Sequence, residues 1–336
     1  MKPTGDSALV VVPVRYVGRY IAGGAALVAI AMIVHTLLSK IPSDTAQCHI
    51  SLDADGHRHR QCTWLVWRFS WDIVGRYFTS SLVLQGLAMT LLLTALTMVV
   101  GISIGVLVAI MRQSPSRVVS SVAWVYAWFF RGTPVYVQLL FWFNIAAIYP
   151  SIHFGLPFVW RWFEVDTVAL MTPFVAALVG LGLNEGAYMS EIVRGGILAV
   201  DEGQIEAASS LGLTRLQTLR LVTLPQAMRV IVPPTGNEVI SMLKTSSLAS
   251  ALSVTELLRA AQNIYSSTYE VIPLLIVASL WYLIVTTILS IGQYYLERRF
   301  SRGSQRQSPL TPWQRLRRDA KGIAGKFRTH RGYVAQ

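Results

Sequence analysis

The sequence has few charged residues, and acidic ones are the scarcest. Only 14% of its 336 residues are charged, and 17 Asp and Glu stand against 29 Lys and Arg. A soluble domain of average composition has about 25% charged residues. Together with 53% hydrophobic residues, this shortage excludes an ordinary soluble domain and predicts a polytopic membrane protein.

Nucleotide-binding and catalytic motifs are missing from the sequence as well. It contains no Gly-x4-Gly-Lys-Ser/Thr loop and no His-Glu-x2-His motif, so binding of ATP through such a loop is not expected. We also find no convincing pair of nucleophile and base. We therefore expect no catalytic residue, no metal and no cofactor in this chain, and energy for its function must come from a partner or from an ion gradient.

Cysteine is limited to Cys48 and Cys62, which both lie in the polar segment 39–76. His49, His57 and His59 are close to them in the sequence, but the spacing does not fit a closed zinc site. We predict a disulfide between the two cysteines in a loop outside the membrane. An unpaired pair and a metal site are the alternatives.

The basic residues are concentrated at one end of the chain. A net charge of +12 is compatible with nucleic-acid binding. However, 11 of the 29 Lys and Arg follow Leu296, and most of the others lie in short loops. This distribution is the one that membrane topology requires, so we expect no nucleic-acid partner.

Six apolar runs are long enough to cross a bilayer. They cover residues 20–38, 80–111, 118–148, 167–192, 230–254 and 271–296. The first resembles a signal peptide in layout, but it is long for one and no small-x-small cleavage site follows it, so we interpret it as a retained span. In the second, Gly101 and Gly105 form a pair suited to close helix contact.

Two of these runs contain helix breakers. Because Gly and Pro occur in segment 131–134, Arg-Gly-Thr-Pro, we expect residues 118–130 to lie along the inner membrane surface and Pro134 to start the third span. One kinked span with a snorkelling Arg131 is the alternative. Pro233-Pro234 is expected to interrupt the fifth span.

The charges also predict the topology. With six spans and both termini in the cytoplasm, 21 of the Lys and Arg fall in cytoplasmic segments and seven outside. This arrangement places the polar stretch 191–225 in the cytoplasm.

Several polar residues fall at membrane depth, where an ionisable group is expensive unless it has a function or a partner. The candidates for a solute pathway are Asn184, Glu185, Tyr188, Glu238, Lys244 and Ser247. One hypothesis is a solvated cavity for a zwitterionic solute, in which carboxylates face its ammonium group while Lys244 or amide donors face its carboxylate. In the alternative, Glu191 and Glu238 lie at the inner membrane surface and pair with Arg194 or Arg229.

Stretch 191–225 has the signals of a short cytoplasmic helix. Asp201 is a plausible N-cap, and Gly212 is a natural stop after the helix. We therefore predict a helix over residues 201–213, followed by a second helical run, 214–222, that ends at Pro225. A plain connecting loop is the alternative.

The motifs in this stretch resemble a known signature. Glu206-Ala-Ala, three residues, Gly212, nine residues and then Val222-Thr-Leu-Pro are similar to the EAA signature of ATP-binding cassette importer permeases. Val222 departs from it, since Ile is commoner there. Segment 131–134, followed by Gln-Leu-Leu after three residues, and the segment 233–238 are similar to the polar amino acid branch. The resemblance covers roughly residues 80–300.

The resemblance implies an all-α polytopic membrane protein with about six transmembrane helices. These would be the five-helix core of a type I importer plus one N-terminal helix. The implied parts are residues 1–79 with the first span and the Cys/His loop, the permease core 80–296, and the basic tail 297–336. The tail is expected either to lie on lipid headgroups or to be solvated.

The implied function is that of a transmembrane permease subunit of an ATP-driven importer of polar amino acids, working by alternating access. Its short helix would contact the ATPase through Asp201, Glu206, Ala207, Ala208 and Gly212. A gradient-driven secondary transporter is the alternative, although the two halves show no inverted repeat. A membrane enzyme would need a catalytic constellation that the sequence lacks.

The family also implies partners and a location. The partners are cytoplasmic ATPase subunits that bind ATP and Mg²⁺, an extracytoplasmic solute-binding protein, a second permease subunit that is identical or homologous, membrane lipid, and a small polar amino acid as substrate. The location is the plasma membrane of a prokaryote, with a multi-pass chain and both termini in the cytoplasm.

Overall fold

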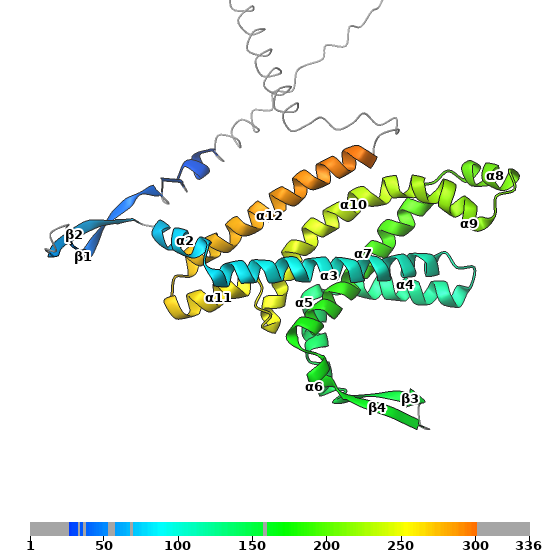
Figure 1. The fold of residues 1–336 in the computed structure, drawn as a ribbon, viewed down its shortest axis with the longest axis horizontal. Coiled ribbons are helices and arrows are strands. Elements are labelled where there is room, and N and C mark those ends of the chain that lie inside the picture. Colours follow the sequence, from blue (N-terminus) through cyan, green and yellow to red (C-terminus); the bar gives the residue numbers. More distant parts are fainter. Residues whose placement is uncertain are drawn as a thin grey trace, which may run out of the picture. The chain divides into compact units, whose positions relative to one another are not determined.

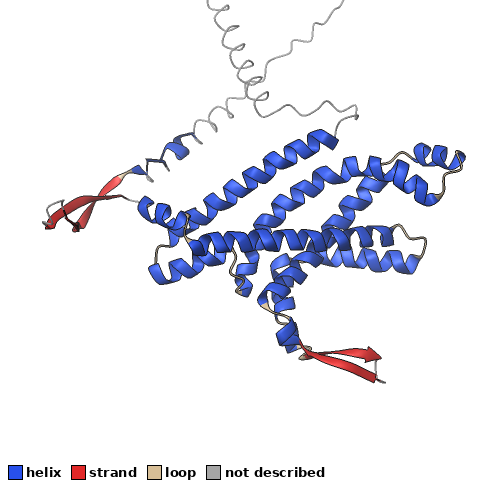
Figure 2. Ribbon diagram, in the orientation of Figure 1, coloured by secondary structure: helices blue, strands red, loops and turns tan. Residues whose placement is uncertain are grey.

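A computed structural model of the chain describes residues 27–32, 34–35, 38–52, 58–67, 70–156 and 160–300. It divides into two units, Met1–Tyr77 and Phe78–Gln336, and each is described here by itself. Helices make up most of the second unit, whose strands form one small hairpin (Figures 1 and 2). The predicted helical fold therefore agrees with the described part of the second unit, apart from this hairpin.

The first unit contains a β-hairpin that the sequence did not predict. Strand β1 (Lys40–Leu52) pairs with β2 (Arg58–Trp67) in antiparallel register, and helix α2 (Trp71–Phe78) follows. Cys48 is the direct register partner of Cys62, so the backbone is compatible with the predicted disulfide, which stays a prediction. The predicted span 20–38 lies mostly outside the described residues.

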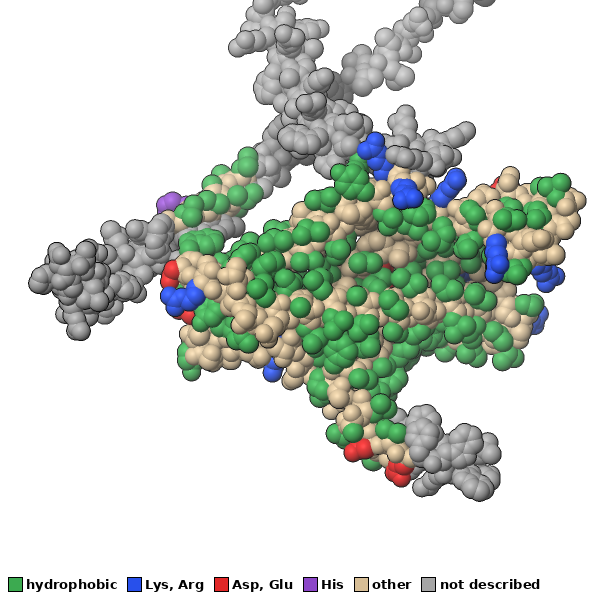
Figure 3. Space-filling view, viewed as in Figure 1, with side chains coloured by type: hydrophobic (Ala, Val, Ile, Leu, Met, Phe, Trp, Pro, Cys, Tyr) green, Lys and Arg blue, Asp and Glu red, His purple; other side chains and the backbone are tan. Residues whose placement is uncertain are grey.

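Two helices of the second unit carry the strongest membrane signal. Helices α3 (Ser81–Arg112) and α12 (Val271–Phe300) are the two, among the described residues, that are long and apolar enough to cross a membrane by the criteria of length and composition. Hydrophobic side chains cover much of the helical surface visible in Figure 3. The predicted number of six spans stays a prediction.

The close contact predicted for the glycine pair of α3 is confirmed. Helix α3 packs against α7 (Pro173–Leu198), and a Cβ atom added at Gly101 or Gly105 would overlap with Glu185 or Met189 respectively. Only glycine lets the two backbones approach this closely. The buried core includes Leu93, Met98, Leu139, Leu181, Met189 and Leu252.

The break in the third apolar run is confirmed, but the predicted position of its first half is wrong. Helix α4 (Arg117–Gly132) ends before Thr133, and α5 (Val135–Phe143) starts after Pro134. Helix α4 packs lengthwise against α3 and α7 (Figure 1) rather than along a membrane surface.

Three hydrogen bonds trace the path of α4 along its neighbours. Ser120 donates to the Arg112 carbonyl at 3.1 Å, and Tyr126 donates to the Leu183 carbonyl at 2.7 Å. Near the end of α4, the Asn184 amide donates to the Phe130 carbonyl at 2.7 Å. Ala123 and Ala127 are buried on α4, and their small side chains let it lie this close to the bundle.

The segment between α5 and α7 forms a second hairpin. A 3₁₀ turn, η1 (Ile145–Ala147), leads to strands β3 (Ser151–Leu156) and β4 (Trp160–Asp166), and a short helix α6 (Thr167–Leu170) precedes α7. The sequence had predicted an external loop here and a span that starts at residue 167. Helix α7 instead begins at Pro173, after an N-cap hydrogen bond from Val175 N–H to the Thr172 hydroxyl.

The polar stretch after α7 folds into short helices that lead into a long one. Helix α8 (Glu202–Ser210) is followed by α9 (Arg215–Thr218), a π-helical turn η2 (Leu219–Thr223) and α10 (Leu224–Thr245). The predicted stop at Pro225 is wrong, because the chain stays helical through it. The wide turn brings Leu224 N–H to the Leu219 carbonyl, so the proline enters the helix at its first turn, where its missing N–H does no harm.

The predicted interruption at Pro233-Pro234 is also wrong, since both prolines lie inside α10. Gln293 of α12 donates to the Pro233 carbonyl at 3.4 Å and to the Asn237 side chain at 2.8 Å. The carbonyls that Pro233 and Pro234 leave without an N–H donor are those four residues earlier, of Arg229 and Val230, so the Gln293 contacts join α12 to α10 beside the prolines without replacing the missing bonds. After α10, a 3₁₀ segment η3 (Ser246–Leu252) precedes α11 (Leu257–Thr268) and α12.

Candidate functional site

Helix α8 lies where the sequence predicted the coupling helix. Asp201 occupies the N-cap position, although its side chain makes no capping hydrogen bond. Gly212 has φ +79°, a left-handed conformation that favours glycine, and it turns the chain back as predicted. Leu213 N–H donates to the Ala208 carbonyl at 3.2 Å, which closes the end of the helix.

Four of the five residues predicted to contact an ATPase are exposed. Asp201, Glu206, Ala207 and Gly212 are accessible, whereas Ala208 is buried against the chain itself. Leu211, which the sequence reading did not select, is 82% exposed. An apolar side chain so exposed beside this turn adds a contact that a partner can bury.

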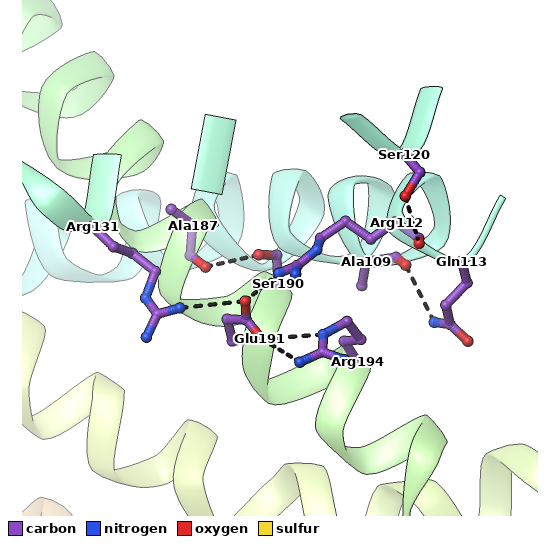
Figure 4. A network of polar contacts seen from close by, with 9 residues as sticks. All are labelled: Ala109, Arg112, Gln113, Ser120, Arg131, Ala187, Ser190, Glu191 and Arg194. Carbon is purple, nitrogen blue, oxygen red and sulfur yellow. Dashed lines mark hydrogen bonds and ion pairs between the residues drawn. The ribbon is translucent and has the colours of Figure 1, made fainter. Parts of the chain in front are cut away.

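Glu191 lies at the centre of a cluster of three arginines (Figure 4). Its Oε1 pairs with Arg112 of α3 and, at 3.3 Å, with Arg131 of α4. Its Oε2 accepts from Arg194 at 2.9 Å and 3.1 Å. The alternative in which Glu191 pairs with Arg194 is therefore confirmed, and Arg112 and Arg131 were missed because their contacts depend on how α3 and α4 pack against α7.

Two buried amides hold the break between α4 and α5. Gln138 donates to the Phe130 carbonyl at 3.0 Å, to the Thr133 carbonyl at 3.1 Å and to the Thr133 hydroxyl at 2.6 Å. Asn184 donates to Gln138 Oε1 at 3.2 Å as well as to Phe130. Carbonyl groups freed by a helix break must be satisfied inside the protein at membrane depth. Asn184 thus supports the break.

A pocket of about 550 Å³ opens beside this break. It is lined by four of the six residues predicted for a solute pathway: Asn184, Glu185, Tyr188 and Glu238. Arg131 and Ser241 also line it. The structure therefore brings two carboxylates and one guanidinium group to the wall of a single polar pocket.

Glu185 is the most buried ionisable group of this pocket. It is 2% exposed and packs against Gly101 of α3. Its Oε1 has no hydrogen-bond partner among the described residues. A buried carboxylate oxygen without a partner destabilises the folded protein, so its retention indicates a ligand or a function.

Lys244 and Ser247 do not line this pocket. They line a second one of about 390 Å³, together with Ser279, Tyr282, Leu283 and Thr286. Lys244 is therefore not placed to face the carboxylate of a solute bound between Glu185 and Glu238. In the first pocket, Arg131 is the basic residue, and its guanidinium lies 5.5 Å from the centre of the Tyr188 ring.

Glu256 is a buried polar residue that the sequence analysis did not select. It is fully buried and caps α11, accepting N–H groups from Leu258 at 2.9 Å and Arg259 at 2.7 Å. Tyr282 of α12 donates to it at 2.9 Å, and Thr90 of α3 is a further donor. Burial raises the pKa of the Glu256 carboxyl, against the lowering effect of these hydrogen bonds.

Comparisons with known proteins identify the family. Residues 101–302, more than half of the chain, match the family described as "Binding-protein-dependent transport system inner membrane component". The chain is 41% identical over 296 residues to the "Arginine transport system permease protein ArgU" of Corynebacterium glutamicum, covering 88% of this chain and 84% of that one. It is 34% identical to the "Glutamine transport system permease protein GlnP" of Escherichia coli, covering 69% and 98%.

A solved structure agrees with these matches. The structure described as "an amino acid ABC transporter with histidines" superposes with a TM-score of 0.58 at 36% identity, covering 68% of this chain and 98% of that chain. Together with the family match, this similarity indicates that the chain is a transport permease subunit rather than an enzyme. The chain belongs to the family of binding-protein-dependent transport system inner membrane components, and it is a membrane-embedded permease subunit of an ATP-driven transporter.

Proposed function

We propose that this permease subunit carries polar amino acids into the cell by alternating access, driven by a separate ATPase that contacts α8. The observation that carries the substrate class is the pocket of about 550 Å³, which combines Glu185 and Glu238 with Arg131. An amino acid is a zwitterion, so it matches a pocket with both signs of charge. The printed names of two relatives, which mention arginine and glutamine, support the same class.

Within this pocket, the carboxylates take the cationic end of the solute. Glu185 offers a buried oxygen that has no partner among the described residues, and Glu238 of α10 lines the same pocket. An ammonium or guanidinium group placed between them satisfies that oxygen and reduces the repulsion between two acids. The predicted pathway role of these residues thus becomes part of the proposal, without Lys244 or Ser247.

Coupling follows from the way in which α7 connects the pocket to α8. Glu185 and Tyr188 lie on α7, which continues to Leu198, and α8 begins four residues later at Glu202. A helix transmits displacement along its axis because its backbone is fully hydrogen-bonded. Force applied to the exposed residues of α8, including Glu206 and Ala207, therefore reaches the pocket wall.

A second permease subunit is expected to cover one face of α10. Asn237, Ser241 and Lys244 are exposed on that helix, and their spacing of four and three residues puts them on one side. A lysine that faces lipid is costly, so this face requires a protein partner or water between two subunits. That subunit is an identical or homologous chain.

The remaining partners follow from the same assignment. An extracytoplasmic solute-binding protein delivers the amino acid, and the ATPase subunits bind ATP and Mg²⁺ in the cytoplasm. The charge distribution supports a multi-pass chain in the plasma membrane of a prokaryote with both termini in the cytoplasm. Basic residues of segment 301–336 give the chain an attraction for anionic lipid.

The test is assembly and activity of the complex with Glu206 reversed in charge. The wild-type subunit and Glu206→Arg are each co-expressed with the ATPase, purified, and assayed for co-purification and for ATP hydrolysis stimulated by solute and binding protein. We expect Glu206→Arg to lose both. The control is Glu270→Arg, which reverses a charge just before α12. Uptake that persists in Glu206→Arg membranes without any ATPase would contradict the proposal and favour a gradient-driven carrier.

A further inference from the structure

Arg131 belongs to two groups of residues at once. Its side chain lines the polar pocket, and its Nη1 also lies 3.3 Å from Glu191 Oε1 in the arginine cluster. This is the longest of the three ion-pair contacts of Glu191. The Arg131 side chain is 43% exposed, against 15% for Arg112 and 34% for Arg194. Arg131 is therefore the most accessible and most loosely held member of the cluster.

We propose that Arg131 binds the carboxylate of the transported amino acid and, in doing so, is released from Glu191, so that occupancy of the pocket is communicated to α8. This inference rests on the proposed function. It assigns to Arg131 the contact with the solute carboxylate that the sequence analysis predicted for Lys244 or amide donors. It also adds a consequence of solute binding inside the protein.

The exchange is chemically balanced because one carboxylate replaces another. A guanidinium group can pair with two oxygens of a carboxylate in a planar, bidentate geometry. Arg131 makes a single long contact to Glu191, so a solute carboxylate in the pocket can offer it a better geometry. Glu191 keeps Arg112 and Arg194 when Arg131 leaves, so no buried charge is left unpaired.

The local structure adds positive potential at the same wall of the pocket. Pro134 and Val135, which start α5, also line the pocket. The first N–H groups of a helix have no acceptor within it, and its dipole is positive at that end. Glu185 and Glu238, which also line the pocket, attract the ammonium group. The arrangement therefore binds a solute that carries both charges, in one orientation.

The release has a structural consequence because Glu191 lies near the end of α7. Arg131 ties the end of α4 to this part of α7, while Arg112 ties α3 to it. Solute binding removes the first tie and leaves the second. The last two turns of α7 then lose a constraint just before α8 begins at Glu202. A ligand shifts a conformational equilibrium only through such differences in contacts.

The experiment uses the complete transporter in lipid vesicles, with its ATPase and its binding protein. Arg131→Gln is compared with Arg194→Gln, which removes another partner of Glu191 that does not line the pocket. The readouts are the KM for uptake of the amino acid and the ratio of hydrolysis with and without loaded binding protein. Losing a charge-assisted hydrogen bond is expected to raise the KM about tenfold or more.

We expect Arg131→Gln to show the raised KM and a ratio close to one, and Arg194→Gln to keep both values near wild type. Glu191→Gln, which frees Arg131 without solute, is expected to raise hydrolysis before solute is added. Equal effects of Arg131→Gln and Arg194→Gln would mean general damage to the cluster and would overturn the inference. So would an unchanged ratio in Arg131→Gln.

Two further outcomes separate this inference from the proposed function. If Arg131→Gln fails to assemble, Arg131→Lys is measured instead, since a lysine keeps the charge but lacks the planar pair of donors. It is expected to raise the KM and lower the ratio, and wild-type values would overturn the inference. If the wild-type complex hydrolyses ATP without any response to polar amino acids, the proposed function fails, whatever Arg131 does.

Discussion

Glu256, the N-cap of α11, accepts a 2.9 Å hydrogen bond from the hydroxyl group of Tyr282 in the middle of α12. The same carboxylate accepts two backbone N–H groups of its own helix and has Thr90 of α3 as a further donor. One side chain thus joins the consecutive helices α11 and α12 to α3, which lies far from them in the sequence. Its loss is expected to loosen that whole end of the bundle.

Glu256→Ala is expected to destabilise the permease by about 2–4 kcal/mol, because it removes a helix cap and leaves a buried hydroxyl group without its acceptor. The measurement is thermal unfolding of the purified subunit in detergent. The control is Glu270→Ala, at a partly exposed position between α11 and α12. It is expected to change stability by less than about 0.5 kcal/mol. Equal melting temperatures for Glu256→Ala and wild type would refute the assigned role.

Glu256→Gln tests the effect of burial on the charge. Burial raises the pKa of this carboxyl in the folded protein, so the folded state holds a proton more readily than the unfolded state, whose carboxyl titrates near the usual value of about 4.3. The stability from this group is therefore fully present below that value and is lost as the pH rises through the raised pKa. Wild type should lose stability relative to Glu256→Gln as the pH rises above about 4.3 and through the raised pKa, measured as melting temperature. Parallel pH profiles would contradict the prediction.

Gly105→Ala is expected to weaken the packing of α3 on α7, because the added Cβ atom would overlap with the Cβ of Met189 and approach its backbone carbon at 3.0 Å. Overpacking of this kind costs about 1–3 kcal/mol. Gly292→Ala in α12 is the matched control, since a Cβ atom there meets nothing within 4 Å. That change should be neutral or stabilise the helix by up to about 1 kcal/mol. The measurement is melting temperature, and a Gly105→Ala variant as stable as Gly292→Ala would refute the close contact.

Local sequence signals predicted much of the fold where the decisive physics is local. The turn at Gly212, the break before Pro134 and the close approach at Gly101 follow from glycine and proline, whose backbone properties hold in any context. The bounds of α3 and of α12 follow from hydrophobicity and length alone.

Sequence signals failed where a neighbour decides the outcome. Pro233 was expected to interrupt its helix, but it lies inside α10, which packs against α7 and α12. Residues 118–130 were placed on a membrane surface because Arg131 follows them, yet Arg131 reaches Glu191 from within the bundle. These partners become visible only after the helices have packed.

The candidate pocket was predicted only in part, because its lining also depends on how the helices pack. Glu185 and Glu238 were selected as acids at membrane depth, and the structure brings both to one pocket. Lys244 satisfied the same rule, but it lies six residues after Glu238 on α10, and that angular offset turns it toward the second pocket. Residue type and depth can be derived from the sequence, whereas the direction in which a side chain points depends on the helix and its neighbours.

From Arg215 to Thr245 the chain is continuously helical, with a π turn at Leu219–Thr223 and two prolines, Pro233 and Pro234, inside α10. A regular α-helix is stiff, whereas a π turn or a proline is where a helix bends. The π turn and the proline pair are therefore the two places at which this helical segment would bend first. A bend there would change the direction of the last part of α10, which carries Glu238 and Ser241 to the pocket.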